Sequence, residues 1–254
     1  MVIALVVVVL FFFLLSSHKE FSVSRVLVIN LDRNTDRLEY VTKQYNNSGF
    51  KLPLERFPAI DGTLVDEKKH LSPVGLSELY EGEKNGRTRH HQLTRGALGC
   101  YLSHIQIFRW MKPGDVYLIL EDDVVIQGPD FLKNAKKAPR DWDMILLGFN
   151  SCLGSSMNEA FVDVKSFWGT CGYLINHKGA QKFLAASGDR FDCQIDTFMS
   201  WMIQSSDFHV YALKNKTVYS GCEFKSDIQT DVKNIGIETY MYRDVLLQFD
   251  EEFF

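Results

Sequence analysis

Buried strands are the clearest pattern in this chain, and one of them ends in acidic residues. Five apolar residues, 116–120, follow the Pro113-Gly114 break. The run is too short for a helix and rich in β-branched and aromatic types, so it predicts a strand buried on both faces, in the middle of a parallel sheet. Residues 121–123 (Glu-Asp-Asp) close this strand, and the apolar residues 124–126 follow them. Acids enclosed by apolar strand residues are costly to bury, which favours a functional site over a solvated turn.

Apolar spacing along the rest of the chain predicts an α/β domain. Further strands are expected over residues 25–31, 50–60, 144–147, 167–176, 210–213 and 218–219. Helices are expected over residues 36–46, 96–111, 178–186 and from about 192 to 204, with Asn34 or Thr35 capping the first and Asp192 the last. Residues 62–95 have no clear core pattern, which predicts a mobile lid, an acceptor loop or disordered filler. Residues 148–158 are rich in Gly and Ser and are expected to form a loop.

The chain begins with a long apolar run. Residues 2–15 are all apolar, and with Met1 and the next two serines the run approaches the lower limit of roughly 17 residues for crossing a bilayer. It lacks the basic leader and Ala-x-Ala site of a secretory signal peptide. We therefore expect a hydrophobic anchor at 1–17 and one globular domain at 18–254. The expected location is a membrane, as a single-pass type II protein of the secretory pathway or on the cytoplasmic membrane side in a bacterium.

Composition narrows the class of protein. The chain has 254 residues, of which 46% are hydrophobic and 24% charged, as expected for one domain of ordinary core size. Its net charge is −4 and no basic stripe follows a predicted helix, so nucleic acid is not an expected partner. Five scattered cysteines without a CxxC pair argue against a zinc site, and Cys100 is interpreted as a buried thiol.

The acidic strand end and the end of the first strand carry the candidate chemistry. Adjacent carboxylates repel one another unless a cation intervenes, so Glu121, Asp122 and Asp123 predict a divalent metal ion. In an extended chain Glu121 and Asp123 would share one side and Asp122 would point to the other. Residues 30–37, rich in Asn, Asp and Arg, could bind a nucleotide phosphate, or could simply be a polar loop.

These motifs, in this order, resemble glycosyltransferase family 25. The resemblance rests on residues 28–33, 57–62, 96–104 and 120–123, and extends from about Val26 to Ile228. The family includes bacterial lipooligosaccharide galactosyltransferases and procollagen galactosyltransferases. The resemblance implies a GT-A fold, in which helices flank a Rossmann-type, mixed but mostly parallel sheet. It also implies UDP-galactose as donor, Mn²⁺ as cofactor, inversion at the anomeric carbon, and a glycan or hydroxylysine-type protein hydroxyl as acceptor.

The resemblance also implies roles for individual residues. The expected metal ligands are Glu121, Asp123 and Asp227. The expected nucleotide and substrate contacts are Asn30, Asp32, Arg33, Arg37, Glu121, Ser103 and His104. Asp196 is the first candidate for the general base that accepts the acceptor proton, and Asp122 is the second. A base of this kind contributes on the order of 10²–10⁴ in rate.

Two other classes of protein remain open. The first is a membrane-anchored protein that binds sugar or nucleotide without transferase activity. The second is an Asp-dependent phosphotransferase, whose nucleophile directly follows the first strand, where Asp32 lies. Residue types alone also leave Ser103 and His104 as ordinary hydrogen-bonded residues of an apolar helix.

Overall fold

A computed structural model describes residues 21–87, 91–128, 131–221 and 224–228. The predicted anchor at 1–17 lies outside these residues. Within the described ranges, no helix combines the length and the apolar character needed to cross a membrane.

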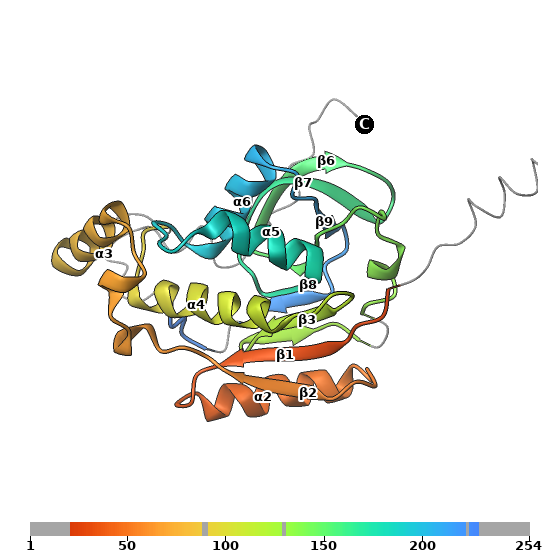
Figure 1. Ribbon diagram of the computed structural model, residues 1–254. Helices are drawn as coiled ribbons and strands as arrows, with labels where there is room; N and C mark the ends of the chain where they lie inside the picture. The colour runs from red at the N-terminus through yellow and green to blue at the C-terminus, as the bar shows by residue number, and fades with distance from the viewer. Residues whose placement is uncertain (1–20, 88–90, 129–130, 222–223, 229–254) are drawn as a thin grey trace, which may run out of the picture.

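The fold is built on a large mixed sheet with helices on both faces (Figure 1). Its eight strands lie in the order β2-β1-β3-β8-β5-β9-β7-β6, and β4 and β10 form a separate antiparallel pair. The strands are β1 (Arg25–Asn30), β2 (Leu54–Pro58), β3 (Val116–Glu121), β4 (Val124–Ile126), β5 (Met144–Gly148), β6 (Ser151–Ser156), β7 (Phe161–Trp168), β8 (Gly172–Asn176), β9 (Val210–Leu213) and β10 (Val218–Ser220). The prediction of a mixed α/β fold is confirmed.

Strand β3 is central, as predicted, but only one of its neighbours is parallel. It pairs in parallel with β1 and antiparallel with β8. Across the whole sheet, β1–β2 and β5–β9 are the other parallel pairs, and the remaining pairs are antiparallel. The strand was expected in the middle of a parallel sheet, and its antiparallel pairing with β8 was not predicted because an apolar run records burial on both faces but not the direction of the next strand.

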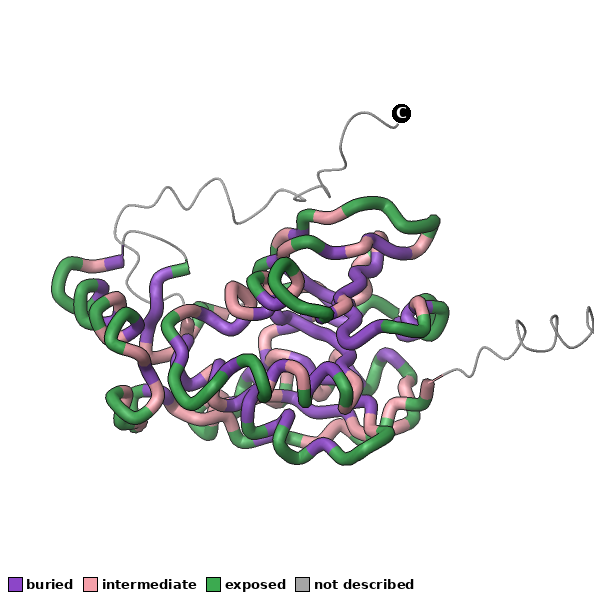
Figure 2. The backbone as a smooth tube through the Cα atoms, turned by 45° about the horizontal axis from the view of Figure 1, so that its top comes forward, coloured by how far each residue is buried: buried purple, intermediate pink, exposed green. Residues whose placement is uncertain are grey.

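Alternating side chains of β3 enter two separate cores. Tyr117 and Ile119 pack into one, whereas Leu118 and Leu120 pack into the other. The first core is covered by α4, α5 and α6, and the second by α2, as Figure 1 shows. Figure 2 shows the buried residues gathered in the interior of the molecule and the exposed residues along its outer surface. The helices are α2 (Thr35–Asn47), α3 (Pro73–Asn85), α4 (Arg95–Trp110), α5 (His177–Ser187) and α6 (Ile195–Ser205).

Two segments predicted as loops contain regular structure. Within residues 62–95 lie α3 and two short 3₁₀ turns, η1 (Gly62–Leu64) and η2 (Glu67–Lys69). Helix α3 begins where the Ser72 Oγ accepts a hydrogen bond from Gly75 N at 3.1 Å, with Pro73 in its first turn. Strand β6 lies within the Gly/Ser-rich segment 148–158, paired with β7. A third 3₁₀ turn, η3, spans Ala135–Lys137.

The start of α4 is packed against two other backbones. A Cβ at Gly99 would lie 2.2 Å from the Ile60 carbonyl oxygen. A Cβ at Gly96 would lie 2.2 Å from the Asp227 carbonyl oxygen. Glycine at both positions therefore lets the segments around Ile60 and Asp227 approach the helix, and these segments form two walls of a cavity.

Candidate active site

A cavity of ≈ 370 Å³ lies at the carboxyl ends of β1 and β3, next to the start of α4. This is the position at which α/β sheets commonly bind ligands. The predicted site residues that line it are Arg33, Arg37, Ser103, His104, Glu121, Asp122, Asp123 and Asp227. The predicted residues Asn30, Asp32 and Asp196 are not part of its lining.

Glu121 and Asp123 are two half-buried acids with few neutralising contacts. Glu121 accepts a hydrogen bond from the Thr170 hydroxyl at 2.7 Å. Asp123 Oδ1 is buried and has no hydrogen-bond partner in the described part of the chain. Burial raises the pKa of both carboxyls, and repulsion from neighbouring acids raises each pKa further. The pair therefore favours a bound cation or a bound proton.

Asp122 has a different environment, because both of its oxygens are held. Asn30 Nδ2 donates to Oδ2 at 2.8 Å, and Arg37 Nη1 donates to Oδ1 at 3.2 Å. Burial raises the pKa of Asp122, while these two hydrogen bonds oppose the rise. Asp122 thus links β1 to α2, and it would have to release Asn30 or Arg37 before acting as a base.

The segment 224–228 brings a carboxylate onto the two arginines of the cavity. Asp227 lies 3.1 Å from Arg33 and 3.2 Å from Arg37, and it accepts a hydrogen bond from Asn34 Nδ2 at 2.7 Å. Arg33 also pairs with Asp61. Asp227 is therefore paired with two guanidinium groups in this structure, and its predicted role as a metal ligand would require it to leave them.

Ser103 and His104 lie in the first core with no exposed surface. Ser103 Oγ accepts from Ile60 N at 2.9 Å and donates to Gly99 O at 2.7 Å, so both hydroxyl bonds hold the local backbone. His104 Nδ1 lies 2.5 Å from the Tyr173 hydroxyl. Burial lowers the pKa of His104 to about 3, which keeps the ring neutral at pH 7.

Three residues predicted for the nucleotide end and the general base, Asn30, Asp32 and Asp196, are engaged by other parts of the protein and lie outside the cavity lining. Asn30 is a structural residue, since its amide is used up by contacts within the protein, including Arg56 and Asp122. Asp32 has 86% of its side chain exposed and pairs with Arg56 outside the cavity. This placement disfavours both nucleotide binding by Asp32 and the phosphotransferase alternative.

Asp196 also differs from its predicted role. Its carboxylate accepts hydrogen bonds from Gly169 N at 2.9 Å and Thr197 N at 2.7 Å, and it lies outside the cavity lining. Burial raises its pKa, and these backbone bonds lower it. The helix cap is Gln194 rather than Asp192. Asp196 therefore fixes the loop between β7 and β8 and is not placed to accept a proton from a molecule in the cavity.

The residues present fit a divalent ion at Glu121 and Asp123. Carboxylate oxygens are the ligands that hard divalent ions prefer, and Asp123 Oδ1 is a buried oxygen that lacks a partner among the described residues. Of the three predicted ligands, Glu121 and Asp123 are available to such an ion, whereas Asp227 is paired with Arg33 and Arg37.

Several residues of the site were not predicted. Asp61 was expected only as part of the segment 57–62 that carries the family resemblance, and Thr170 only as part of the strand 167–176. Their roles depend on contacts across the fold, to Arg33 and Glu121 respectively. The sequence did indicate that Cys100 lies beside His104, since the two residues are four positions apart and so share one face of α4.

Comparison with known proteins identifies the family. The family "Glycosyltransferase family 25 (LPS biosynthesis protein)" matches residues 23–199. A "Glycosyltransferase 25 family member" of Anopheles gambiae is 32% identical over 183 residues, covering 65% of this chain and 29% of that protein. "Procollagen galactosyltransferase 1-B" of Xenopus laevis is 27% identical over 210 residues, covering 76% of this chain and 33% of that protein.

The chain spans about a third of the length of these relatives. Among solved structures, the apo-form glycosyltransferase GlyE of Streptococcus pneumoniae TIGR4 aligns with a TM-score of 0.44 at 12% identity, covering 84% of this chain and 58% of GlyE. The family match includes β1, α4, β3 and the first turns of α6, and thus most of the cavity wall. On this match, the chain belongs to glycosyltransferase family 25.

Proposed function

We propose that this chain is an inverting, Mn²⁺-dependent galactosyltransferase of GT-A type that uses UDP-galactose. The acceptor would be a hydroxyl of a glycan or of a hydroxylysine-type protein. Family membership supports glycosyl transfer, and relatives named procollagen galactosyltransferase support galactose as the sugar. The position of the cavity at the carboxyl ends of β1 and β3 supports binding of a nucleotide sugar.

One observation carries the metal part of the proposal. Two half-buried acids, Glu121 and Asp123, line the same cavity, and the buried Asp123 Oδ1 has no hydrogen-bond partner among the described residues. Leaving a buried polar atom unpaired typically costs about 1–3 kcal/mol. When bound by these two residues, a divalent ion would neutralise the charge that develops on the UDP leaving group.

Arg33 and Arg37 supply the complementary positive charge. Both guanidinium groups line the cavity, and both are within 3.2 Å of the Asp227 carboxylate. A diphosphate is an anion of the same kind, and arginine binds such oxygens in pairs. The donor's diphosphate would therefore compete with Asp227 for these arginines.

The proposal is tested by Asp123→Asn, which keeps the shape of the side chain but removes its charge. We expect this variant to weaken Mn²⁺-dependent UDP binding, measured by titration calorimetry. Loss of an outer-shell partner of a metal typically costs about 10–100-fold in affinity, and loss of a direct ligand should cost more. Transfer from UDP-galactose should fall with it. UDP-glucose and a panel of glycan and hydroxylysine-peptide acceptors, assayed in parallel, identify the substrates.

The matched control is Asp32→Asn, because Asp32 is an exposed acid outside the cavity. It should retain UDP binding and transfer. A different result is that wild-type protein binds UDP with Mn²⁺ and yet neither transfers the galactose of UDP-galactose nor hydrolyses this donor. That result would support the alternative of a sugar- or nucleotide-binding protein without transferase activity. Near-normal transfer by Asp123→Asn would remove the metal assignment.

The expected membrane location remains part of this proposal. It rests on the apolar run at 2–15, which lies outside the described residues. Fractionation of cells expressing the full chain and a variant that lacks residues 1–17 tests it.

A further inference from the structure

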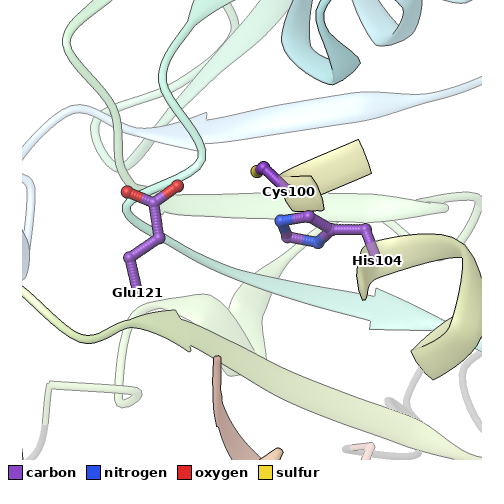
Figure 3. A group of neighbouring side chains, drawn as sticks. All are labelled: Cys100, His104 and Glu121. Atoms are coloured by element: carbon purple, nitrogen blue, oxygen red, sulfur yellow. The ribbon is translucent and has the colours of Figure 1, made fainter. Parts of the chain in front are cut away.

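Three potential metal ligands of different chemical type meet at the inner wall of the cavity. Cys100 and His104 come from successive turns of α4, and Glu121 comes from the end of β3 (Figure 3). One ligand atom from each residue lies within 4.8 Å of the other two. All three residues line the cavity. Because residues four apart share one face of a helix, α4 presents the sulfur and the imidazole to the same point.

His104 provides an independent sign of a missing partner. The ring is fully buried, and its Nε2 has no hydrogen-bond partner among the described residues. Figure 3 shows the ring turned with a nitrogen toward the Glu121 carboxylate. The other nitrogen, Nδ1, is 2.5 Å from the Tyr173 hydroxyl. Metal-binding histidines commonly have this arrangement, in which the second nitrogen is fixed by a polar neighbour.

Glu121 is oriented in a similar way. Its Oε1 accepts the 2.7 Å hydrogen bond from the Thr170 hydroxyl, which holds the carboxylate at the end of β3. His104 and Glu121 thus each have an outer partner, which is Tyr173 on β8 for His104 and Thr170 on the segment between β7 and β8 for Glu121. A ligand set with outer partners in place is already arranged to receive an ion.

We propose that Cys100, His104 and Glu121 form a metal site of their own, which selects a borderline ion such as Zn²⁺ over Mn²⁺. Thiolate sulfur and imidazole nitrogen favour Zn²⁺, whereas oxygen-only sets suit Mn²⁺. Binding converts the Cys100 thiol to a thiolate, and its proton passes to solvent. Three protein ligands would leave one position of a tetrahedral zinc site open to a further ligand.

This inference revises the prediction from cysteine spacing. The absence of a CxxC pair argued against zinc, but that rule detects only sites whose ligands are close in sequence. Here 17 positions separate His104 from Glu121 along the chain, and the fold brings them together.

The site also carries a regulatory consequence, which rests on the proposed function. Glu121 is shared with the proposed Mn²⁺ site, so an ion held by Cys100 and His104 would withdraw Glu121 from the donor. Zn²⁺ is therefore expected to inhibit transfer in competition with Mn²⁺.

The metal site is tested with Co²⁺, which takes zinc positions and reports its ligands by absorption. Purified full-length protein is freed of metal with a chelator and titrated with Co²⁺. We expect a thiolate-to-cobalt charge-transfer band in the near ultraviolet that saturates at one equivalent and disappears on addition of Zn²⁺. Cys100→Ser should remove the band, whereas Cys193→Ser, a cysteine outside the cluster, should retain it.

Tyr173→Phe tests the outer partner. This variant keeps the ring that stacks on His104 and removes the hydroxyl. The band should remain, and the Co²⁺ affinity should fall by about 10–100-fold. An unchanged affinity would show that the Tyr173 contact does not orient a ligand.

A second readout uses the wild-type chain and so does not depend on folding of a variant. Zn²⁺ should protect Cys100 from a thiol reagent, as measured by mass spectrometry of its peptide. The proposal is overturned if folded wild-type protein gives no band and no protection, or if the band survives Cys100→Ser. Failure of Mn²⁺-dependent UDP binding would count against the proposed function alone, because the Co²⁺ band does not require the donor.

Discussion

At the scale of single residues, Asn30 connects three parts of the fold through one amide. Its Nδ2 donates to Asp122 at 2.8 Å and to the Asn34 carbonyl at 2.8 Å, and its Oδ1 accepts from Arg56 at 2.9 Å. The residue is 2% exposed. A nucleotide would have to displace these bonds to reach it, so Asn30 acts by holding Asp122 and the start of α2 in place.

We expect Asn30→Ala to destabilise the protein by about 1–3 kcal/mol, because it removes the hydrogen bond that Asn30 donates to the buried Asp122 carboxylate. Urea unfolding at pH 7 measures the change. Asp32→Ala, two positions away and exposed, should stay within about 0.5 kcal/mol of wild type. Equal stability of Asn30→Ala and wild type would contradict a structural role.

The same residues explain how far the site could be predicted from sequence. Glu121 and Asp123 are marked by local context, since a buried strand ends at them. The surroundings of Asp32 and Asp196 are set by Arg56 and by Gly169, which lie 24 and 27 positions away. Residue type shows that an acid can do chemistry, but only the tertiary contacts show whether it is already engaged.

At the scale of elements, Glu67 joins three short pieces of structure around one side of the cavity. From η2, it accepts a hydrogen bond from the Tyr80 hydroxyl of α3 at 2.7 Å and pairs with Arg95 of α4 at 3.2 Å. Arg95 also pairs with Glu83 of α3 at 2.7 Å. These contacts fix α3 against the start of α4, although the outer face of α3 is exposed.

These contacts predict a pH dependence. The Tyr80 hydroxyl, together with Arg95, lowers the pKa of Glu67 from 4.5 to about 2. Because the pKa of Glu67 is lower in the folded than in the unfolded state, the ionised carboxylate stabilises the folded protein at pH values above 4.5. This stabilisation is lost as the pH falls from 4.5 toward 2. Glu67→Gln should therefore lower the thermal midpoint at pH 7 more than at pH 2.5.

Thermal unfolding by circular dichroism across this pH range measures the effect. Glu81→Gln, an exposed carboxylate on α3, makes the same charge change without the contacts to Tyr80 and Arg95. The thermal midpoints of the two variants should differ at pH 7 and become equal at pH 2.5. Parallel curves for both would show that the Glu67 contacts do not contribute.

Most elements could be predicted because their apolar positions repeat with the period of a helix or a strand. Helix α3 was missed because few of its residues are buried, namely Gly75, Leu79 and Gly82, and two of these three are glycines. Its Ser72-Pro73 start was the available signal. Strand β6 was missed because Gly and Ser carry no hydrophobic alternation, and its pairing with β7 decides the conformation.

At the scale of the whole molecule, the segment 224–228 joins the far end of the described chain to the first βα loop. Asp227 contacts Arg33, Arg37 and Asn34, and Phe224 packs against Tyr40 with ring centroids 5.3 Å apart. Ile228 packs against the first core. The segment thus closes one wall of the cavity with residues almost 200 positions away from their partners.

We expect Asp227→Asn to tighten UDP binding, because the diphosphate would no longer compete with a carboxylate for the two arginines. Ion pairs of this partly exposed kind contribute up to about 1 kcal/mol, which corresponds to a gain of up to about fivefold. Titration calorimetry with UDP, with and without Mn²⁺, measures it. Weaker binding that appears only with Mn²⁺ would instead support the original assignment of Asp227 as a metal ligand.

The Thr94 hydroxyl makes two bonds at the junction of this wall with α4. It accepts from Ala97 N at 3.0 Å, which caps the helix, and donates to the Ile228 carbonyl at 2.9 Å. Because the oxygen serves the helix and the proton serves the segment, the two bonds can be broken independently. Loss of the bond to Ile228 alone would consequently leave the cap of α4, and the side chains that this helix carries into the cavity, in place.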